Sequence, residues 1–291
     1  MSQPQLPPQT PNETWEGGPL GVMDAMGMGW RLMMSDFWPL WLVAFVFTAI
    51  NFGIGLFGSI PYLGACIALA AAIFVRPQLG AGLFLAVRQR VDGAAAEVRN
   101  VFEGFRLRYW QSVVAMLPLV LAGVGFGIVA SIVALSGGIL AGQEPGSEEV
   151  VVPVLIIVGI LLLVGLVVFS LFFIFALLAV WDHPESGWEA AKASMRLVKD
   201  HFGSALGLGV LFALISLGAI LAGLIAFCIG ILFTMPIVTV WFCATTVYLY
   251  RSWRGEPLQQ EPVRPDGFPD QGWEGPGPAP GGPPAAPPAL P

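Results

Sequence analysis

The stretch that decides the fold is GWEAAKASMRLVKDHFGSALGLGVLFALIS, residues 187–216. It starts as a short amphipathic segment with a few charges and continues, from Phe202, as a long apolar run. The stretch MDAMGMGWRLMMSDFWPLWLVAFVFTAIN, residues 23–51, has the same form, and a looser echo lies at residues 102–120. At a constant offset (190 − 25 = 165), the first two stretches match at these positions: Ala25 with Ala190, Arg31 with Arg196, Leu32 with Leu197, and Phe37 with Phe202. We therefore expect an internal repeat of amphipathic helix plus apolar hairpin.

Composition places the chain in the bilayer. Apolar residues make up 56%, charged residues 11%, and the mean hydropathy is +0.77, whereas soluble domains carry about 25% charged residues. The net charge is −6, and most acids lie in tails and loops. The 13 Lys and Arg are scattered, which excludes a nucleic-acid footprint. All three cysteines lie in apolar runs, so no disulfide framework is expected.

Six apolar runs are long enough to cross about 30 Å of hydrocarbon as helices. Strand alternation of the kind found in barrels is missing, so the predicted fold class is all-α: a polytopic integral membrane protein of six transmembrane helices in three hairpins, with short amphipathic interfacial helices. The membrane domain is predicted at residues 22–254. The expected spans are residues 37–60, 62–87, 111–136, 151–181, 203–227 and 231–250.

Two tails flank this domain. Residues 1–21 are predicted to be a disordered N-terminal tail, and residues 255–291, which contain 12 prolines, a disordered Pro/Gly-rich tail. PxxP spacing occurs in the second tail, which leaves open a protein partner that binds it.

Orientation follows from the positive charges. Twelve of the 13 Lys and Arg fall before span 1, between spans 2 and 3, between spans 4 and 5, or after span 6. The positive-inside rule then predicts that both termini lie in the cytoplasm and that the protein resides in the cytoplasmic (inner) membrane. Seven tryptophans gather at the same boundary: Trp30, Trp38, Trp41, Trp110, Trp181, Trp188 and Trp253.

Three stretches carry a family resemblance: residues 60–106, HPESGWEAAKASMRLVKDHFG and IGILFTMPIVTVWFCATTVYLYRSW. They resemble a group of uncharacterised six-span bacterial integral membrane proteins related to the membrane domain associated with glycerophosphodiester phosphodiesterases. The resemblance covers residues 22–253 and rests on structural motifs such as Phe-Glu-Gly-Phe at residues 102–105. It implies a fold and a membrane location, and it transfers no catalytic residue.

No catalytic constellation is visible in the sequence. The only histidines, His183 and His201, follow Asp182 and Asp200, but their spacing matches no metal-ligand motif. No GxSxG, HExxH, P-loop or dinucleotide motif occurs. We therefore expect a protein that is not an enzyme and that uses no cofactor and no metal.

One residue stands out as a speculative substrate or lipid contact. Arg76 is the only charge deep in an apolar run, about 18 Å from Arg88 if the helix is continuous. Asn51 in span 1 lies at a matching depth, so we expect Arg76 in the interior, facing Asn51. The alternative is a snorkelling side chain, or a bend at Arg76–Pro77 that makes the charge shallower.

Glycines with small-xxx-small spacing, Gly123 to Gly127 and Gly203 to Gly207, are expected to pack helices within the chain. The leading functional hypothesis is a non-enzymatic membrane scaffold that interacts with membrane lipids or an envelope partner. The alternative is a small permease with a site near Arg76. The sequence does not determine the oligomeric state.

Overall fold

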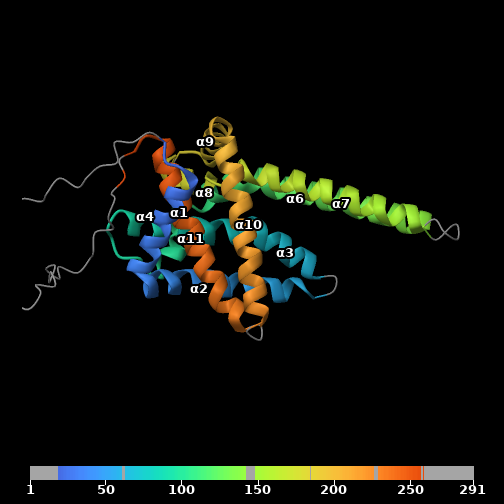
Figure 1. Ribbon diagram of the computed structural model, residues 1–291, viewed down its shortest axis with the longest axis horizontal. Coiled ribbons are helices and arrows are strands. Elements are labelled where there is room, and N and C mark those ends of the chain that lie inside the picture. Colours follow the sequence, from blue (N-terminus) through green and yellow to red (C-terminus); the bar gives the residue numbers. More distant parts are fainter. Residues whose placement is uncertain are drawn as a thin grey trace, which may run out of the picture.

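The computed structural model describes residues 19–60, 63–141, 148–183, 185–225, 229–256 and 258. These residues form helices and connecting turns and contain no strand. The helices are α1 (Val22–Ser35), α2 (Phe37–Gly58), α3 (Leu63–Phe74), α4 (Arg76–Val91), α5 (Asn100–Leu107), α6 (Tyr109–Ala141), α7 (Glu148–Leu171), α8 (Ala176–Asp182), α9 (Gly187–Asp200), α10 (Phe202–Ile225) and α11 (Ile229–Trp253) (Figure 1).

The chain is an all-α multi-pass membrane protein, as predicted. Five helical segments of the described residues are long and apolar enough to cross a membrane, and there are six if the bent pair α3–α4 is counted as one span. The five are Phe37–Gly58, Tyr109–Ser136, Val151–Asp182, Phe202–Leu224 and Gly230–Trp253.

The segment expected as span 2 is two helices rather than one. The chain bends by about 40° between α3 and α4, at Val75, whose φ is −117° and ψ −53°. Pro77 lies in the first turn of α4, where its missing N–H is tolerated, and its ring disfavours a continuous helix through this point. The bend named as an alternative in the sequence analysis is therefore the observed conformation.

The segment expected as span 4 is also interrupted. α7 ends at Leu171, and the backbone passes through short i→i+3 turns before α8 begins at Ala176. The N–H groups of Phe172, Phe173 and Ile174 donate to the carbonyls three residues earlier. These turns keep the backbone hydrogen-bonded across the interruption.

Each short amphipathic helix is separated from the following long helix by one residue outside the helical region. Asp36 (φ −139°, ψ 51°) separates α1 from α2, Arg108 (φ −136°, ψ 31°) separates α5 from α6, and His201 (φ −124°, ψ 33°) separates α9 from α10. Two of these residues are held by distant helices. The Asp36 carboxylate lies 2.8 Å from Arg90 Nε of α4, and the His201 ring stacks on Trp253 of α11 with centroids 4.5 Å apart.

The amphipathic helices are also arranged alike in space: α1 packs on α11, α5 on α4, and α9 on α8. The three hairpins are α2 with α3–α4, α6 with α7–α8, and α10 with α11. Each amphipathic helix therefore lies against the last helix of a hairpin other than the one that follows it. Together the three contacts link the hairpins in a closed ring. We call α1, α4, α5, α8, α9 and the C-terminal half of α11 the base.

Small residues permit these close approaches. A Cβ atom at Gly104 would lie 2.2 Å from the carbonyl oxygen of Gln78, and one at Gly82 would lie 2.0 Å from that of Val101. On α9, Ser194 Oγ donates to the carbonyl of Phe172 at 2.7 Å. Backbones this close leave no room for larger side chains.

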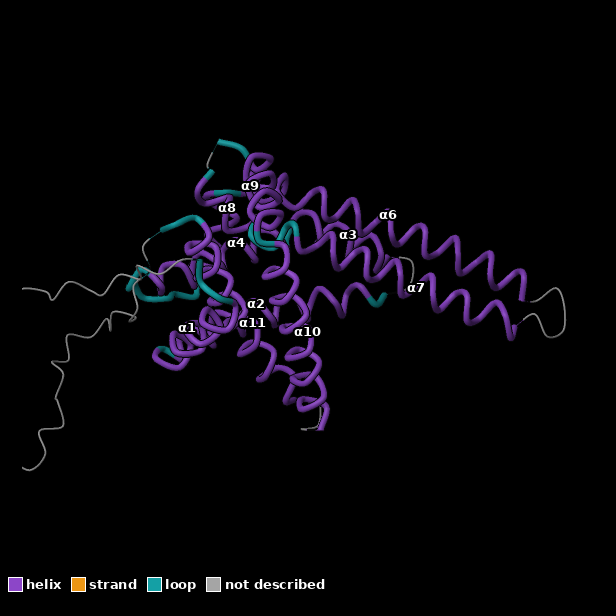
Figure 2. Tube along the Cα trace, turned by 45° about the horizontal axis from the view of Figure 1, so that its top comes forward, coloured by secondary structure: helices purple, strands orange, loops and turns teal. Residues whose placement is uncertain are grey.

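The hairpin α6–α7 projects outward from the base (Figures 1 and 2), although α6 contacts α3, α4, α8 and α9, and α7 contacts α10. None of the residues in the most apolar window of Val151–Asp182 is buried, against 39% in that of Gly230–Trp253. The two ends of the described chain meet at the base, where the Leu20 N–H donates to Ser252 Oγ at 2.6 Å.

Candidate functional site

The predicted pair Arg76 and Asn51 does not form a joined site. The Arg76 side chain is exposed, contrary to the expectation that it lies in the interior. The Asn51 amide Nδ2 donates to the carbonyl of Phe47, within its own helix, at 2.9 Å. Neither residue lines the groove between α7, α10 and α11 or the hollow beside the first turn of α2, both described below.

The helix break explains the position of Arg76. Because α4 starts at Arg76, the guanidinium is at the end of a short helix rather than in the middle of a long one. α5 runs antiparallel to α4, with Gly82 against Val101 and Gly104 against Gln78. Arg76 and Arg106 therefore lie at the same end of this helix pair, which favours a shallow position for Arg76.

An ionic cluster joins the ends of three helices and was not predicted. Asp182, at the end of α8, lies 2.8 Å from Arg88 Nη1 of α4. The Tyr250 hydroxyl of α11 donates to Asp182 Oδ2 at 2.7 Å, and Arg254 Nη1 pairs with the same oxygen. In the sequence Asp182 stands out only beside His183, because its three partners lie 94, 68 and 72 residues away.

A second network surrounds this cluster. Arg254 Nη1 also donates to the Tyr250 hydroxyl at 2.8 Å, and its Nε lies 3.2 Å from Glu256. Arg251 Nη2 lies 2.6 Å from Asp92, which follows α4. Trp181 Nε1 donates to the carbonyl of Ala81 at 3.0 Å. These contacts tie α4, α8 and α11 together, so the cluster has a structural role.

The histidines are used in packing rather than in a shared cluster. His201 Nδ1 lies 3.2 Å from the carbonyl of Leu197, and His183 Nδ1 lies 3.5 Å from Glu185. Within the described ranges, no group of three or more His, Cys, Asp or Glu side chains is arranged to hold a metal ion.

The glycine motifs do not serve the purpose that their spacing predicts. Positions 123, 125 and 127 on α6, and 203 and 207 on α10, would place a Cβ atom in open space, with nothing within 4 Å. The expected packing within the chain is therefore wrong for these motifs. The reason is that α6 meets α7 through Phe126, whose ring lies 3.4 Å from a Cβ at Gly165, so the glycines point elsewhere.

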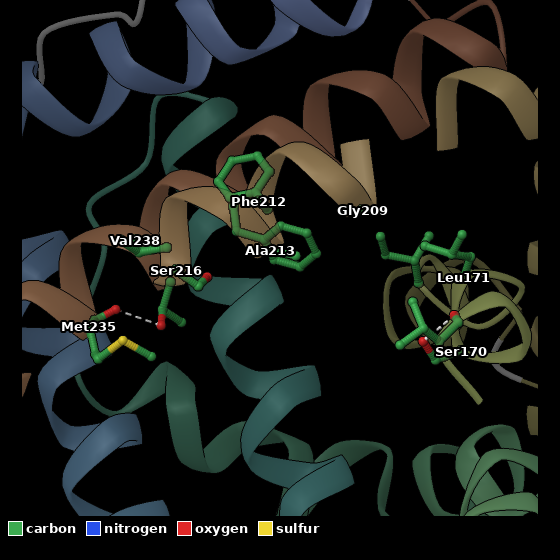
Figure 3. A pocket seen from close by; sticks show the side chains of 12 residues that line it. Ser170, Leu171, Gly209, Phe212, Ala213, Ser216, Met235 and Val238 are labelled. Atoms are coloured by element: carbon green, nitrogen blue, oxygen red, sulfur yellow. Dashed lines mark hydrogen bonds between the residues drawn. The ribbon is translucent and has the colours of Figure 1, made fainter. Parts of the chain in front are cut away.

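An apolar groove with a volume of about 370 Å³ lies between α7, α10 and α11. Figure 3 shows Ser170 and Leu171 of α7 on one side, and Phe212, Ala213 and Ser216 of α10 facing them. Two of its hydroxyls are turned to their own helices: Ser170 donates to the carbonyl of Val167, and Thr239 to that of Met235, each at 2.7 Å. The groove therefore offers a largely apolar lining.

A second hollow of about 370 Å³ lies between the first turn of α2 and the loop before α5. Trp38, Pro39, Trp41 and Leu42 line it on α2, with Ala96 and Val98 opposite. Trp41 Nε1 donates to the carbonyl of Phe233 at 3.3 Å. Aromatic residues of this kind suit a membrane–water boundary.

Comparison with known proteins adds no relative: no family model, no curated protein and no solved structure matches this chain. The resemblance to six-span bacterial membrane proteins stays a prediction.

Proposed function

We propose that the protein is a non-enzymatic scaffold of the cytoplasmic membrane, with both termini in the cytoplasm, that contacts membrane lipids and a partner transmembrane helix. One observation carries the proposal. A base held by close backbone contacts and ion pairs supports a hairpin, α6–α7, whose apolar surface is left exposed by the rest of the described chain.

The open glycine face of α6 supports the partner contact. Small residues four apart let helix backbones approach closely in lipid, and Gly123 and Gly127 have this spacing. Both face open space within the described chain. A helix from a second protein or a second copy would meet the same close-approach surface that Gly82 and Gly104 provide in the base.

The orientation rests on the charges. Arg31, Arg88, Arg99, Arg106, Lys192, Arg196, Lys199, Arg251 and Arg254 all lie in the base or in its loops. An impermeant thiol reagent applied to intact cells should label Ser59→Cys, at the far end of α2, and spare Ala95→Cys, in a background without Cys66, Cys228 and Cys243. Labelling of Ala95→Cys alone would invert the proposed orientation.

We infer that the three amphipathic helices and their hairpins are copies of one unit. Gly29, Gly104 and Ser194 stand two residues before Arg31, Arg106 and Arg196. All three are buried and lie against another hairpin's last segment. The interruptions at Asp36, Arg108 and His201 support the same inference.

The small-permease alternative gains no support from the position of Arg76, which is exposed and lies outside both hollows. The proposed protein partner of the Pro-rich tail concerns residues 259–291, which lie outside the described residues.

The test is the native mass of the protein in mild detergent. The wild type should run as a complex larger than a monomer, and the double variant Gly123→Leu/Gly127→Leu should run as a monomer with an unchanged unfolding midpoint. Val129→Phe on α6, which adds bulk at an exposed position on the opposite side of the helix from Gly127, is the matched control and should keep the complex. A monomeric wild type, or an unaffected glycine variant, would contradict the proposal.

A further inference from the structure

The groove between α7, α10 and α11 has one closed end, next to the base. Leu171 covers Gly209 there, since a Cβ at Gly209 would lie 2.6 Å from Leu171 Cδ2. Directly beyond Leu171, the ring of Phe172 stacks on that of Phe202, the first residue of α10, with centroids 6.0 Å apart. The groove therefore begins next to the junction of α9 and α10.

Helix rise gives the depth of the groove. Gly209 and Ser216 follow Phe202 by 7 and 14 residues, which is about 10 and 21 Å along α10. Half of the hydrocarbon core is about 15 Å. The groove thus lies within, and extends slightly beyond, the leaflet that borders the base.

The volume of the groove favours a single acyl chain over a helix as its occupant. A helix about 10 Å in diameter has a cross-section of about 80 Å², so 370 Å³ would hold only about 5 Å of it, or one turn. A single acyl chain is far thinner and needs no hydrogen-bond partner. The hydroxyls of Ser170 and Thr239, which are turned to their own helices, fit such an apolar occupant.

The positive charges at the end of α9 favour a lipid with an anionic headgroup. Arg196 and Lys199 lie one turn apart near the end of α9, and both are exposed. No ion pair to either is formed by the residues that the structure describes. Asp200 is exposed next to them, and Glu189, which pairs with Lys192, interacts electrostatically with Arg196, so these five side chains carry a net charge of +1. Each Lys or Arg near a membrane surface contributes about 1 kcal/mol of attraction to anionic lipid.

We propose that this groove holds one acyl chain of an anionic phospholipid, whose phosphate lies against Arg196 and Lys199. The proposal rests on the membrane placement given under the proposed function, but not on the partner helix. It makes the junction of α9 and α10 a lipid-recognition site.

Native mass spectrometry of the purified full-length protein tests this. Delipidated protein is mixed with dioleoyl phosphatidylglycerol or with dioleoyl phosphatidylcholine, which share both chains and differ in charge. Wild type should retain the anionic lipid about tenfold better. Ala213→Phe fills the groove from an exposed position and should reduce retention of both lipids about tenfold, whereas Ala222→Phe, exposed on α10 outside the groove, should not.

The headgroup is tested separately. Arg196→Gln/Lys199→Gln should abolish the preference for phosphatidylglycerol while retaining phosphatidylcholine at the wild-type level, and Arg99→Gln, exposed elsewhere, should change nothing. Equal retention of the two lipids by wild type would overturn the proposal, and so would undiminished retention by Ala213→Phe. The double variant Gly123→Leu/Gly127→Leu should bind lipid normally, so that failure of the scaffold proposal and failure of this one are distinguishable.

Discussion

The base, which contains the short amphipathic helices, and the more apolar α6–α7 hairpin have opposite surroundings. In the base, a Cβ at Gly82, Gly104 or Gly187 would lie 2.0–2.2 Å from a backbone carbonyl oxygen of another helix. In the hairpin, a Cβ at Gly123 or Gly127 would meet nothing within 4 Å. Hydropathy can place a helix in the membrane, whereas close approach of backbones determines which helices pack tightly against one another.

The largest expected effect concerns these glycines. Gly104→Leu should lower the free energy of unfolding by about 3 kcal/mol or more, because α5 and α4 must separate to admit the side chain. Gly127→Leu is the control, and it should change the same quantity by less than about 0.5 kcal/mol. Titration with a denaturing detergent in mixed micelles measures both. If Gly104→Leu and Gly127→Leu lowered the free energy of unfolding by similar amounts, the proposed difference in packing between the base and the hairpin would be wrong.

The next effect concerns the ionic cluster. Asp182→Asn leaves Arg88 and Arg254 without their shared carboxylate, so the free energy of unfolding should fall by about 1–3 kcal/mol. Glu97→Gln removes an ion pair with Arg99 that is largely exposed and should cost less than about 1 kcal/mol. The same titration applies. If Asp182→Asn proves as mild as Glu97→Gln, the cluster does not hold α4, α8 and α11 together.

The smallest effect concerns Arg76. Arg76→Leu should leave the protein inserted and change the free energy of unfolding by less than about 0.5 kcal/mol, because the side chain is exposed. Arg90→Leu, at the other end of α4, should cost about 3–5 kcal/mol, because Arg90 is 1% exposed and pairs with Asp36. A loss of several kcal/mol in the free energy of unfolding for Arg76→Leu would indicate that Arg76 is buried and would contradict its exposed position.

The sequence predicted the helical class, the apolar spans and the positions of the amphipathic helices, because these depend on local composition and periodicity. The span predicted at residues 62–87 was continuous, and a bend at Arg76–Pro77 was only an alternative, because a proline inside an apolar run is compatible with both. The contacts of Asp182 and Asp36 could not be predicted, since their partners are distant in sequence. Glycine spacing also failed as a guide, because Gly123 and Gly104 look alike until the helices around them are placed.

Photocrosslinking from α6 tests the central claim most directly. A photoreactive amino acid at Ile128, which is 55% exposed, is compared with one at Val87 in α4, which is fully buried. After irradiation in native membranes, mass spectrometry identifies what each position has joined. The account predicts adducts of Ile128 with lipid or another polypeptide, and of Val87 only with its own chain. Adducts joining Ile128 to α2 or α10 of the same chain would show that the hairpin folds against these helices and would contradict the exposed position of α6.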